Sequence, residues 1–322
     1  MTSLQNAQIL SRPEYNSPVT ETETLIDIAP SAGGLFDRKP FLVRHHLDNH
    51  PLFGLSRLMQ LAQYLPRECI EYNAGDLPVS LGDSPTPGNG LSVEETLRRI
   101  RDCRSWMVLK NVERDTEYAK LLEQCLDEVS MAVGGRIANM RQQEGFIFVS
   151  SPGSITPYHM DPEHNFLLQI SGSKTVAIFD PADRELIPHE TLERFHSGFR
   201  RKLILEESHR GRAREFRLEP GTGLHFPVTA PHWVRNGDDV SVSFSITFRS
   251  RSCDRRETLY RINASLRKIG ISPVAPGQSA WRDGFKLGIH GMTRSVKRAL
   301  RRARRPDGAS VSRRGARYGN QF

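Results

Sequence analysis

Residues Ser154 to Pro181 read SITPYHMDPEHNFLLQISGSKTVAIFDP and contain the features that decide the fold. A His-x-Asp pair, His159 and Asp161, precedes two apolar runs, 166–170 and 175–179, that a Ser-Gly-Ser turn separates. Apolar runs of this length around a glycine turn predict a buried β-hairpin. Because residues i and i+2 of an extended segment face the same way, the side chains of His159 and Asp161 should converge on one point, where a metal could bind.

Two further stretches bear on this metal site. His46 and Asp48 form another His-x-Asp, but they run into Pro51 and a helical pattern without a strand pair behind them, so we interpret them as a surface loop. The segment 219–248 reads as a short strand, a proline-flanked turn that carries His232, and a long alternating strand. His232 would complete a set of two histidines and one carboxylate.

This ligand set suits octahedral Fe(II) and leaves one face of the metal open. Catalytic zinc takes a similar three-ligand set, so ligand type alone leaves the metal undecided. His232 standing alone would read as a hydrogen-bonded turn residue. His225, in a Leu-His-Phe-Pro stretch, is predicted to be a strand residue near the site and a backup ligand, whereas His164 has the wrong parity relative to His159.

Residues 146–248 resemble the cupin-like and JmjC oxygenases that use Fe(II) and 2-oxoglutarate, most closely the branch containing the asparaginyl hydroxylase that modifies hypoxia-inducible factor. The resemblance is closest from 156 to 181. It implies an all-β core, a double-stranded β-helix of the cupin or JmjC jelly-roll type, with flanking α-helices. It also implies the iron ligands and the residues that contact 2-oxoglutarate. The implied ligands are His159, Asp161 and His232, and the implied cosubstrate contacts are Thr156, Asn165, Lys174 and Ser245, the last standing where that branch has an asparagine.

Elementary electrostatics supports two of these contacts. A dicarboxylate in an apolar barrel needs its far charge neutralised, and a lysine with a hydroxyl beside it does this by a charge-assisted hydrogen bond. Lys174 opens an otherwise apolar run, and its alternative is a strand end whose ammonium snorkels into solvent. For Thr156 and Asn165 the alternative is local hydrogen bonding in a turn.

The resemblance implies an oxygenase, most simply a hydroxylase of a protein side chain or small molecule. It would couple decarboxylation of 2-oxoglutarate to hydroxylation of a C–H bond, with O2 as the other cosubstrate; demethylation begins with the same step and stays open. One alternative is a non-catalytic metal- or ligand-binding cupin that regulates transcription, although no helix-turn-helix pattern is evident. Another is a cupin isomerase or dioxygenase that needs no cosubstrate.

Composition predicts the cellular location of the protein and the state of its cysteines. The 322 residues contain no apolar run of membrane-spanning length and no charged-then-apolar leader at their start, which predicts a cytoplasmic protein. The four cysteines, Cys69, Cys103, Cys125 and Cys253, form no CxxC pair. They are therefore expected to be reduced thiols.

The pattern divides the chain into five segments. Residues 1–30 are predicted to be disordered, 31–144 to form an α/β layer on the barrel, 145–250 to form the catalytic barrel, 251–291 to be helical, and 292–322 to be a basic tail. The α/β layer should contain helices near 55–62, 92–100 and 118–133, the second with a Ser92–Glu95 capping box. The polar stretch 184–217 is either a substrate-recognising insertion or a solvated connector. By resemblance, the helices after the barrel are expected to support a homodimer.

The tail holds the excess charge of the chain. Residues 293–322 contain ten Lys and Arg and one Asp, a charge of +9, whereas the whole chain carries +8. Such a tail could contact nucleic acid or an anionic surface through counterion release. The alternative is a solvated tail without a dedicated partner.

Overall fold

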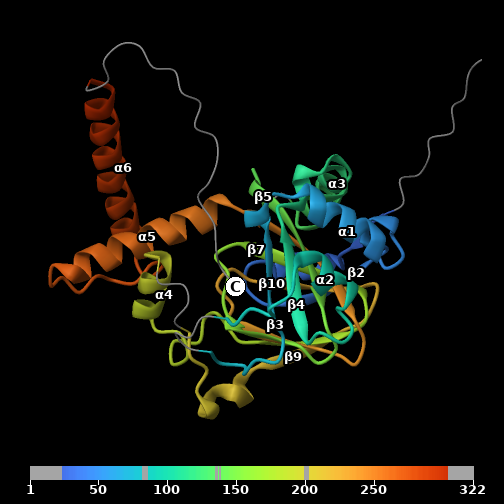
Figure 1. Cartoon of the computed structure of the whole chain (residues 1–322). Helices are drawn as coiled ribbons and strands as arrows, with labels where there is room; N and C mark the ends of the chain where they lie inside the picture. The colour runs from blue at the N-terminus through green and yellow to red at the C-terminus, as the bar shows by residue number, and fades with distance from the viewer. Residues whose placement is uncertain (1–23, 82–85, 135–136, 138, 199–202, 304–322) are drawn as a thin grey trace, which may run out of the picture.

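The computed structural model describes residues 24–81, 86–134, 137, 139–198 and 203–303, and the structural statements below refer to them. Two antiparallel β-sheets form the core (Figure 1). The larger has the strand order β1-β2-β10-β7-β12-β5-β4-β3 and the smaller the order β6-β11-β8-β9. The larger sheet consists of β1 (Ile26–Asp27), β2 (Phe41–His45), β3 (Ile70–Ala74), β4 (Ser105–Lys110), β5 (Arg141–Ser150), β7 (His164–Ser171), β10 (Thr222–Phe226) and β12 (Ser241–Arg249). The smaller consists of β6 (Ile155–His159), β8 (Lys174–Ile178), β9 (Arg214–Leu218) and β11 (His232–Asn236).

The large sheet separates an outer apolar core from an inner cavity. Side chains alternate between the two faces of a strand, and in β12 Phe244 and Ile246 join the main apolar core while Ser245 and Thr247 line the cavity. The two-sided burial explains why every residue of this strand is buried. The long alternating strand predicted at the end of segment 219–248 is therefore confirmed.

The two sheets face each other. Leu167 and Leu224 from the large sheet share one buried apolar cluster with Val176 and Leu218 from the small sheet. This arrangement is the predicted all-β double-stranded β-helix, with helices packed around it.

The hairpin predicted for residues 166–179 is wrong. Strand β7 belongs to the large sheet, where it pairs with β10 and β12, while β8 belongs to the small sheet, where it pairs with β11 and β9. The turn around Gly172 therefore carries the chain from one sheet to the other. Two apolar strands around a tight turn give the same sequence pattern whether they pair with each other or with distant strands, and here the distant partners prevail.

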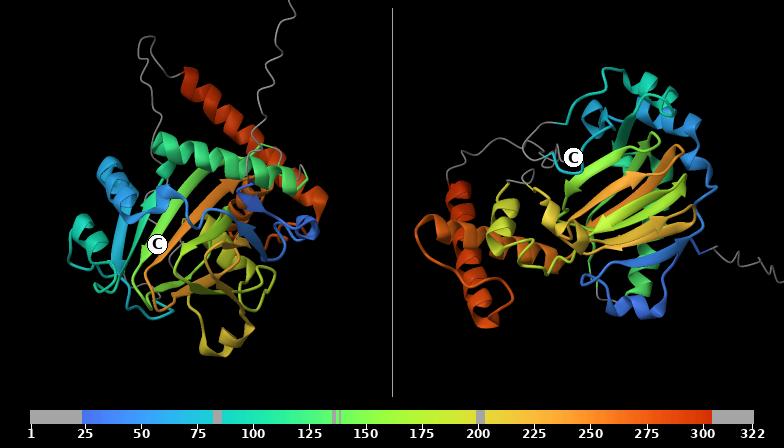
Figure 2. Two further views of the ribbon diagram at one scale, coloured as in Figure 1. Left: turned by 90° about the vertical axis from the view of Figure 1, so that its right-hand side faces the viewer. Right: turned by 90° about the horizontal axis from the view of Figure 1, so that it is seen from below.

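Helices near the N-terminus cover the outer face of the large sheet (Figure 2). They are α1 (Leu55–Tyr64), α2 (Val93–Arg98) and α3 (Thr116–Ala132), with short 3-10 turns at Pro30–Gly34, Pro51–Phe53, Arg67–Cys69 and Val112–Arg114. The capping box of Ser92 and Glu95 is present at α2. The apolar face of α3 packs into the main core, as its spacing predicts. Residues 1–23 of the segment expected to be disordered lie outside the described residues, and part of the remainder forms β1.

The rest of the helices lie to one side of the barrel (Figure 2, right). They are α4 (His189–His196), α5 (Arg251–Lys268) and α6 (Ala280–Ala303), with a 3-10 segment at Glu207–Arg212. The polar stretch 184–217 thus contains α4, which is tied to α5 by an ion pair between Glu193 and Arg267 at 2.8 Å. The segment boundary expected at 292 falls inside α6, because the helical pattern continues through the basic residues. The tail beyond 303 lies outside the described residues.

All four cysteines are free, and three of them are buried. Within the described ranges, every helix is too short or too polar to cross a bilayer.

Candidate metal centre and adjoining cavity

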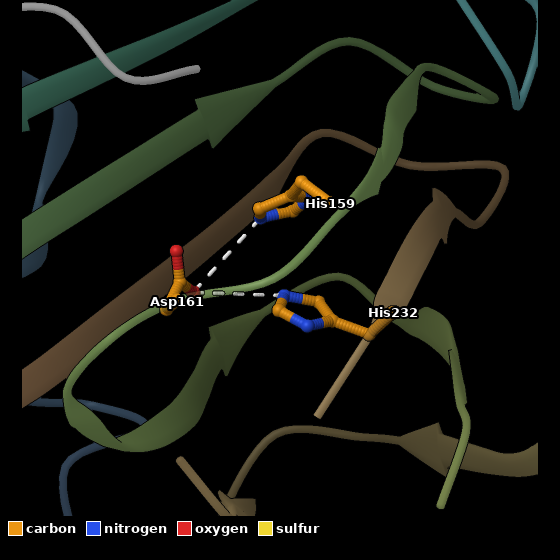
Figure 3. A group of neighbouring side chains, drawn as sticks. All are labelled: His159, Asp161 and His232. Atoms are coloured by element: carbon orange, nitrogen blue, oxygen red, sulfur yellow. Dashed lines mark ion pairs between the residues drawn. The ribbon is translucent and has the colours of Figure 1, made fainter. Parts of the chain in front are cut away.

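Two histidines and one aspartate meet at the edge of the small sheet (Figure 3). His159 ends β6, Asp161 follows in the next loop, and His232 begins β11. The two strands pair with His159 directly opposite His232. One ligand atom from each of the three side chains lies within 4.8 Å of the others, and the described part of the chain contains no second group of this kind. The predicted convergence of these side chains is therefore present.

The backbone fixes the orientation of both imidazoles. Nδ1 of His159 lies 2.7 Å from the carbonyl oxygen of Pro157, and Nδ1 of His232 lies 3.0 Å from that of Ala230. Because a carbonyl only accepts, Nδ1 carries the proton on each ring and Nε2 keeps its lone pair. The two Nε2 atoms lie 4.0 and 3.8 Å from Oδ2 of Asp161, too far for hydrogen bonds. Histidines that bind metals are held in the same way.

His232 is neutral near pH 7. Burial, and after it the neighbouring His159, lower its pKa to about 4, although Asp161 opposes the shift. Neutral imidazole is the form that binds metals. A hydrogen bond also holds the backbone of the loop that carries Asp161, since the backbone N–H of Thr229 donates to the backbone oxygen of Asp161 at 2.8 Å.

One cavity beside the three side chains runs between the sheets. It brings together all seven site residues predicted from the sequence, namely Thr156, His159, Asp161, Asn165, Lys174, His232 and Ser245. Its other lining residues are Lys110, Asn111, Gln142, Glu144, Phe146, Phe148, Ser150, Glu163, Leu167, Phe226, Val234 and Thr247. The sequence therefore located the cavity, and the roles of these residues stay predictions.

Lys174 carries a buried amine into the cavity. The residue is 4% exposed, so its side chain does not snorkel into solvent. Burial lowers its pKa to about 7, and no charged neighbour offsets this effect. Across the described ranges its Nζ has neither an ion pair nor a hydrogen bond. A buried ammonium without a partner costs several kcal/mol, so this end of the cavity is built to receive an anion.

Three polar side chains lie around the same space. Thr156 sits on β6 and lines the cavity with Lys174. Ser245 donates to Oδ1 of Asn165 at 2.8 Å, which links β12 to β7. Since the amide oxygen is occupied, Asn165 has its Nδ2 group left to donate to a ligand. Ser245 therefore acts on the orientation of Asn165.

The other histidines considered from the sequence lie elsewhere. His225 points away from the cavity into the outer core, where its ring stacks on Phe41 at a centroid distance of 4.6 Å, so it is no backup ligand. His164 stacks on Phe36 at 4.7 Å and approaches Ser250, which agrees with its exclusion. His46 is exposed in a bend after β2, as the surface-loop interpretation predicts.

Sequence reasoning missed the acidic residues of the cavity. Glu144 lies on β5, and Glu163 follows the metal-site loop and faces Arg249 at 3.4 Å. Burial raises the pKa of Glu144, and Glu113 raises it further. In the described part of the chain no cation pairs with Glu144. The available signal was the two-residue spacing of positions 142, 144, 146 and 148, which share one face of β5 and line the cavity.

The chain is similar to one described protein family and to several known proteins. It matches the family described as cupin-like domain over residues 35–253. It is 30% identical over 103 residues to Lysine-specific demethylase 8 of Danio rerio, covering 30% of this chain and 24% of that protein. It is 34% identical over 104 residues to JmjC domain-containing protein D of Dictyostelium discoideum, covering 29% and 22%. The chain thus spans about a quarter of the length of the curated relatives it matches.

The chain also resembles solved structures of the ribosomal oxygenase YcfD from Escherichia coli. One has a TM-score of 0.45 and 16% identity, covering 84% of this chain and 66% of that one. Another, in complex with cobalt and 2-oxoglutarate, has a TM-score of 0.43 and 15% identity, covering 80% and 63%. Likeness at this level carries no argument about activity.

The family match, in contrast, is extensive. It spans 219 of the 322 residues, from before β2 to the start of α5, and includes all three residues of the candidate metal centre. The chain therefore belongs to the cupin-like domain family.

Proposed function

We propose that the protein is an Fe(II)- and 2-oxoglutarate-dependent oxygenase that hydroxylates a C–H bond. The observation that carries this proposal is the unpaired, buried Lys174 in the same cavity as the His159, Asp161 and His232 group. A metal site alone suits many cupins. A metal site that shares a cavity with a buried amine in need of an anion suits a dicarboxylate that reaches from one to the other.

The donor set fits the metal. Two neutral imidazoles, each with Nδ1 held by a backbone carbonyl, and one carboxylate form the facial triad typical of non-haem Fe(II) oxygenases. When bound, iron supplies the activation of O2 and the oxidation of the C–H bond. The protein's own contribution is to hold His159, Asp161 and His232 in place before the metal arrives.

The remaining residues bind and orient the cosubstrate. Lys174 neutralises the distal carboxylate, the Thr156 hydroxyl adds a hydrogen bond, and the amide of Asn165 donates from the side. Phe148 and Leu167 line the same cavity and keep water away from the reacting groups. Water exclusion strengthens each of these charged contacts.

The acidic lining favours a substrate with a positive charge. Glu144 is half-buried, and a cationic group would stabilise its ionised form, which burial and Glu113 otherwise disfavour. Three curated relatives are named for lysine-specific demethylation, which agrees with a cationic target. We therefore propose an amino or guanidino group next to the reacting carbon, on a protein side chain or a small molecule.

The two alternative functions leave features of the cavity unexplained. In a non-catalytic metal- or ligand-binding regulator, a complete group of three metal ligands together with the buried amine of Lys174 would have no chemical role. In a cupin that works without a cosubstrate, Lys174 would be equally idle, and such enzymes commonly use an extra histidine that this centre lacks among the described residues. We place the activity in the cytoplasm, where the four free cysteines would stay reduced.

Titration of the Fe(II)-loaded protein with 2-oxoglutarate under argon tests the proposal. We expect the visible charge-transfer band of the metal-bound 2-oxo acid, and succinate release once O2 is admitted. Asp161→Ala should lose both, while Asp48→Ala, in the His-x-Asp pair outside the cavity, should keep both. If the wild-type protein bound iron but gave no band and had no affinity for 2-oxoglutarate, the oxygenase proposal would fail and a ligand-binding cupin would be favoured.

A further inference from the structure

The last described helix exposes a continuous apolar stripe. Trp281, Phe285, Ile289 and Met292 of α6 are 71%, 64%, 48% and 72% exposed. Their spacing of four, four and three residues places them on one face of a helix. Exposed large apolar residues are unremarkable one at a time, but four on one helix face mark a binding surface.

Helix α6 is fixed to the protein through a different, polar face. Oδ2 of Asp283 accepts from the backbone N–H of Gly277 at 2.8 Å, and Nζ of Lys286 donates to Oδ1 of Asn263 and to the carbonyl of Val274, both at 2.7 Å. Asn263 is a fully buried residue of α5. A surface helix normally buries its apolar stripe and exposes its polar face. Here the polar contacts point inward, and the apolar stripe remains available to another partner.

The charge of α6 indicates what that partner carries. Its 24 residues include seven Lys and Arg and one Asp, which is a charge of +6, and two further arginines follow at 304 and 305. The helix also stands away from the barrel, beside α5 (Figure 1). A surface that binds α6 should therefore be apolar where it meets the stripe and negatively charged around it.

We propose that α6 binds an anionic lipid surface, lying in the plane of the membrane interface with the four apolar side chains buried below the headgroups. Basic amphipathic helices with Trp and Phe on the apolar face bind in this way, and each nearby Lys or Arg strengthens the attraction to anionic lipid. A second copy of α6 would bring two segments of charge +6 together. A nucleic acid would neutralise the charge but leave the apolar stripe in water.

The direct test is flotation of the full-length protein with two kinds of vesicle, phosphatidylcholine alone and phosphatidylcholine with 30 mol% phosphatidylglycerol. We expect at least roughly tenfold more binding to the anionic vesicles, decreasing with added salt. Tryptophan emission should shift to shorter wavelength on binding. Trp281→Phe should remove that shift while most binding remains, because the other two tryptophans, Trp106 on β4 and Trp233 on β11, lie in the two sheets and not on α6.

Variants of the stripe separate its role from that of the basic residues. Phe285→Ser with Ile289→Ser should reduce vesicle binding at least roughly tenfold, while Met131→Ser on α3, 73% exposed, should not. Iron binding should be equal in all of these proteins, so a failure here would not affect the proposed oxygenase.

Two results would overturn the proposal. Vesicle binding that survives the double variant would assign it to the basic residues alone. Light scattering that shows a dimer, dissociated by the double variant, in a protein that ignores vesicles would assign the stripe to a second copy.

Discussion

His159 and His232 are direct partners across two antiparallel strands, with ring centroids 4.2 Å apart, although 73 positions separate them in the chain. The register of β6 against β11 thus creates the metal centre. The register shifts just after His232, between positions 232 and 234. Such irregularities re-aim side chains at functional sites, and this one lies where the second histidine must meet the first.

Removal of either histidine should abolish tight metal binding. We expect His159→Ala and His232→Ala to weaken Fe(II) or Mn(II) binding at least roughly a hundredfold, about 3 kcal/mol. The loss has a simple cause, since two ligands cannot replace the three that converge here. Anaerobic calorimetry measures the affinity, and His46→Ala, in the exposed His-x-Asp, is the matched control. If His46→Ala and His232→Ala bound Fe(II) with equal affinity, the metal centre could not be at this site.

The buried amine should make 2-oxoglutarate binding depend on pH. Lys174 has a pKa of about 7 in the absence of an anion, below its ordinary value of 10.5. A bound carboxylate would raise this pKa again, so binding above pH 7 must take up a proton. Affinity of the metal-loaded protein should therefore fall as pH rises above 7, by up to about tenfold per unit. Calorimetry in buffers of different ionisation enthalpy should show uptake of close to one proton at pH 8.5.

Two variants separate Lys174 from the other lysine of the cavity. Lys174→Met should weaken 2-oxoglutarate binding roughly a hundredfold and abolish the proton uptake. Lys110→Met should do neither, because Lys110 is already paired with Glu71 at 2.6 Å.

The lowered pKa of Lys174 should also make the stability of the anion-free protein depend on pH. The unfolded chain binds more protons between pH 7 and 10.5, so the free energy of unfolding should rise with pH across that window, and Lys174→Met should remove the rise.

The local sequence pattern predicted the helices and strands of the fold better than it predicted which strands pair with each other. The apolar face of α3, the Ser92 capping box and the alternation of β12 are each encoded within a few residues. The pairing of β7 with β12 depends on contacts between segments about 80 residues apart, which no local pattern contains. This is why the strands around Gly172 were found but were wrongly paired with each other.

The same distinction explains what was predicted of the site. The His-x-Asp spacing and the position of Lys174 at the start of an apolar run are local signals, and both lead to the cavity. Glu144 reaches it only because β5 starts at Arg141 and runs beside β12. Strand ends are poorly marked in sequence, so the acidic lining appears only in the structure. The apolar stripe of α6 was likewise hidden, because an exposed and a buried stripe have the same spacing.

The charge of Glu144 should decide which substrates are accepted. A peptide with an arginine and the same peptide with citrulline differ by one charge at nearly equal shape. If the cavity prefers a cation, the wild-type protein should release more succinate with the arginine peptide. Glu144→Gln should reduce that preference roughly tenfold or more, about 1.4 kcal/mol. Affinity for 2-oxoglutarate should not change, which separates a loss of substrate binding from general damage. A preference for citrulline, or none in either protein, would contradict a cationic substrate.

The turn between the sheets should tolerate no side chain at Gly172. Its φ is +65°, and a Cβ there would lie 2.4 Å from the carbonyl oxygen of Val240. Gly153 has a similar φ of +69° but open space around it, so the pair separates backbone strain from collision. Gly153→Ala should cost about 1 kcal/mol, the penalty for a left-handed alanine. Gly172→Ala must in addition move β12 or the turn, and we expect about 3 kcal/mol in all. Urea denaturation followed by circular dichroism measures both. Equal costs would mean that the connection between the two sheets can shift without loss, and that the close approach of Gly172 to Val240 does not help to hold β7 and β8 in their separate sheets.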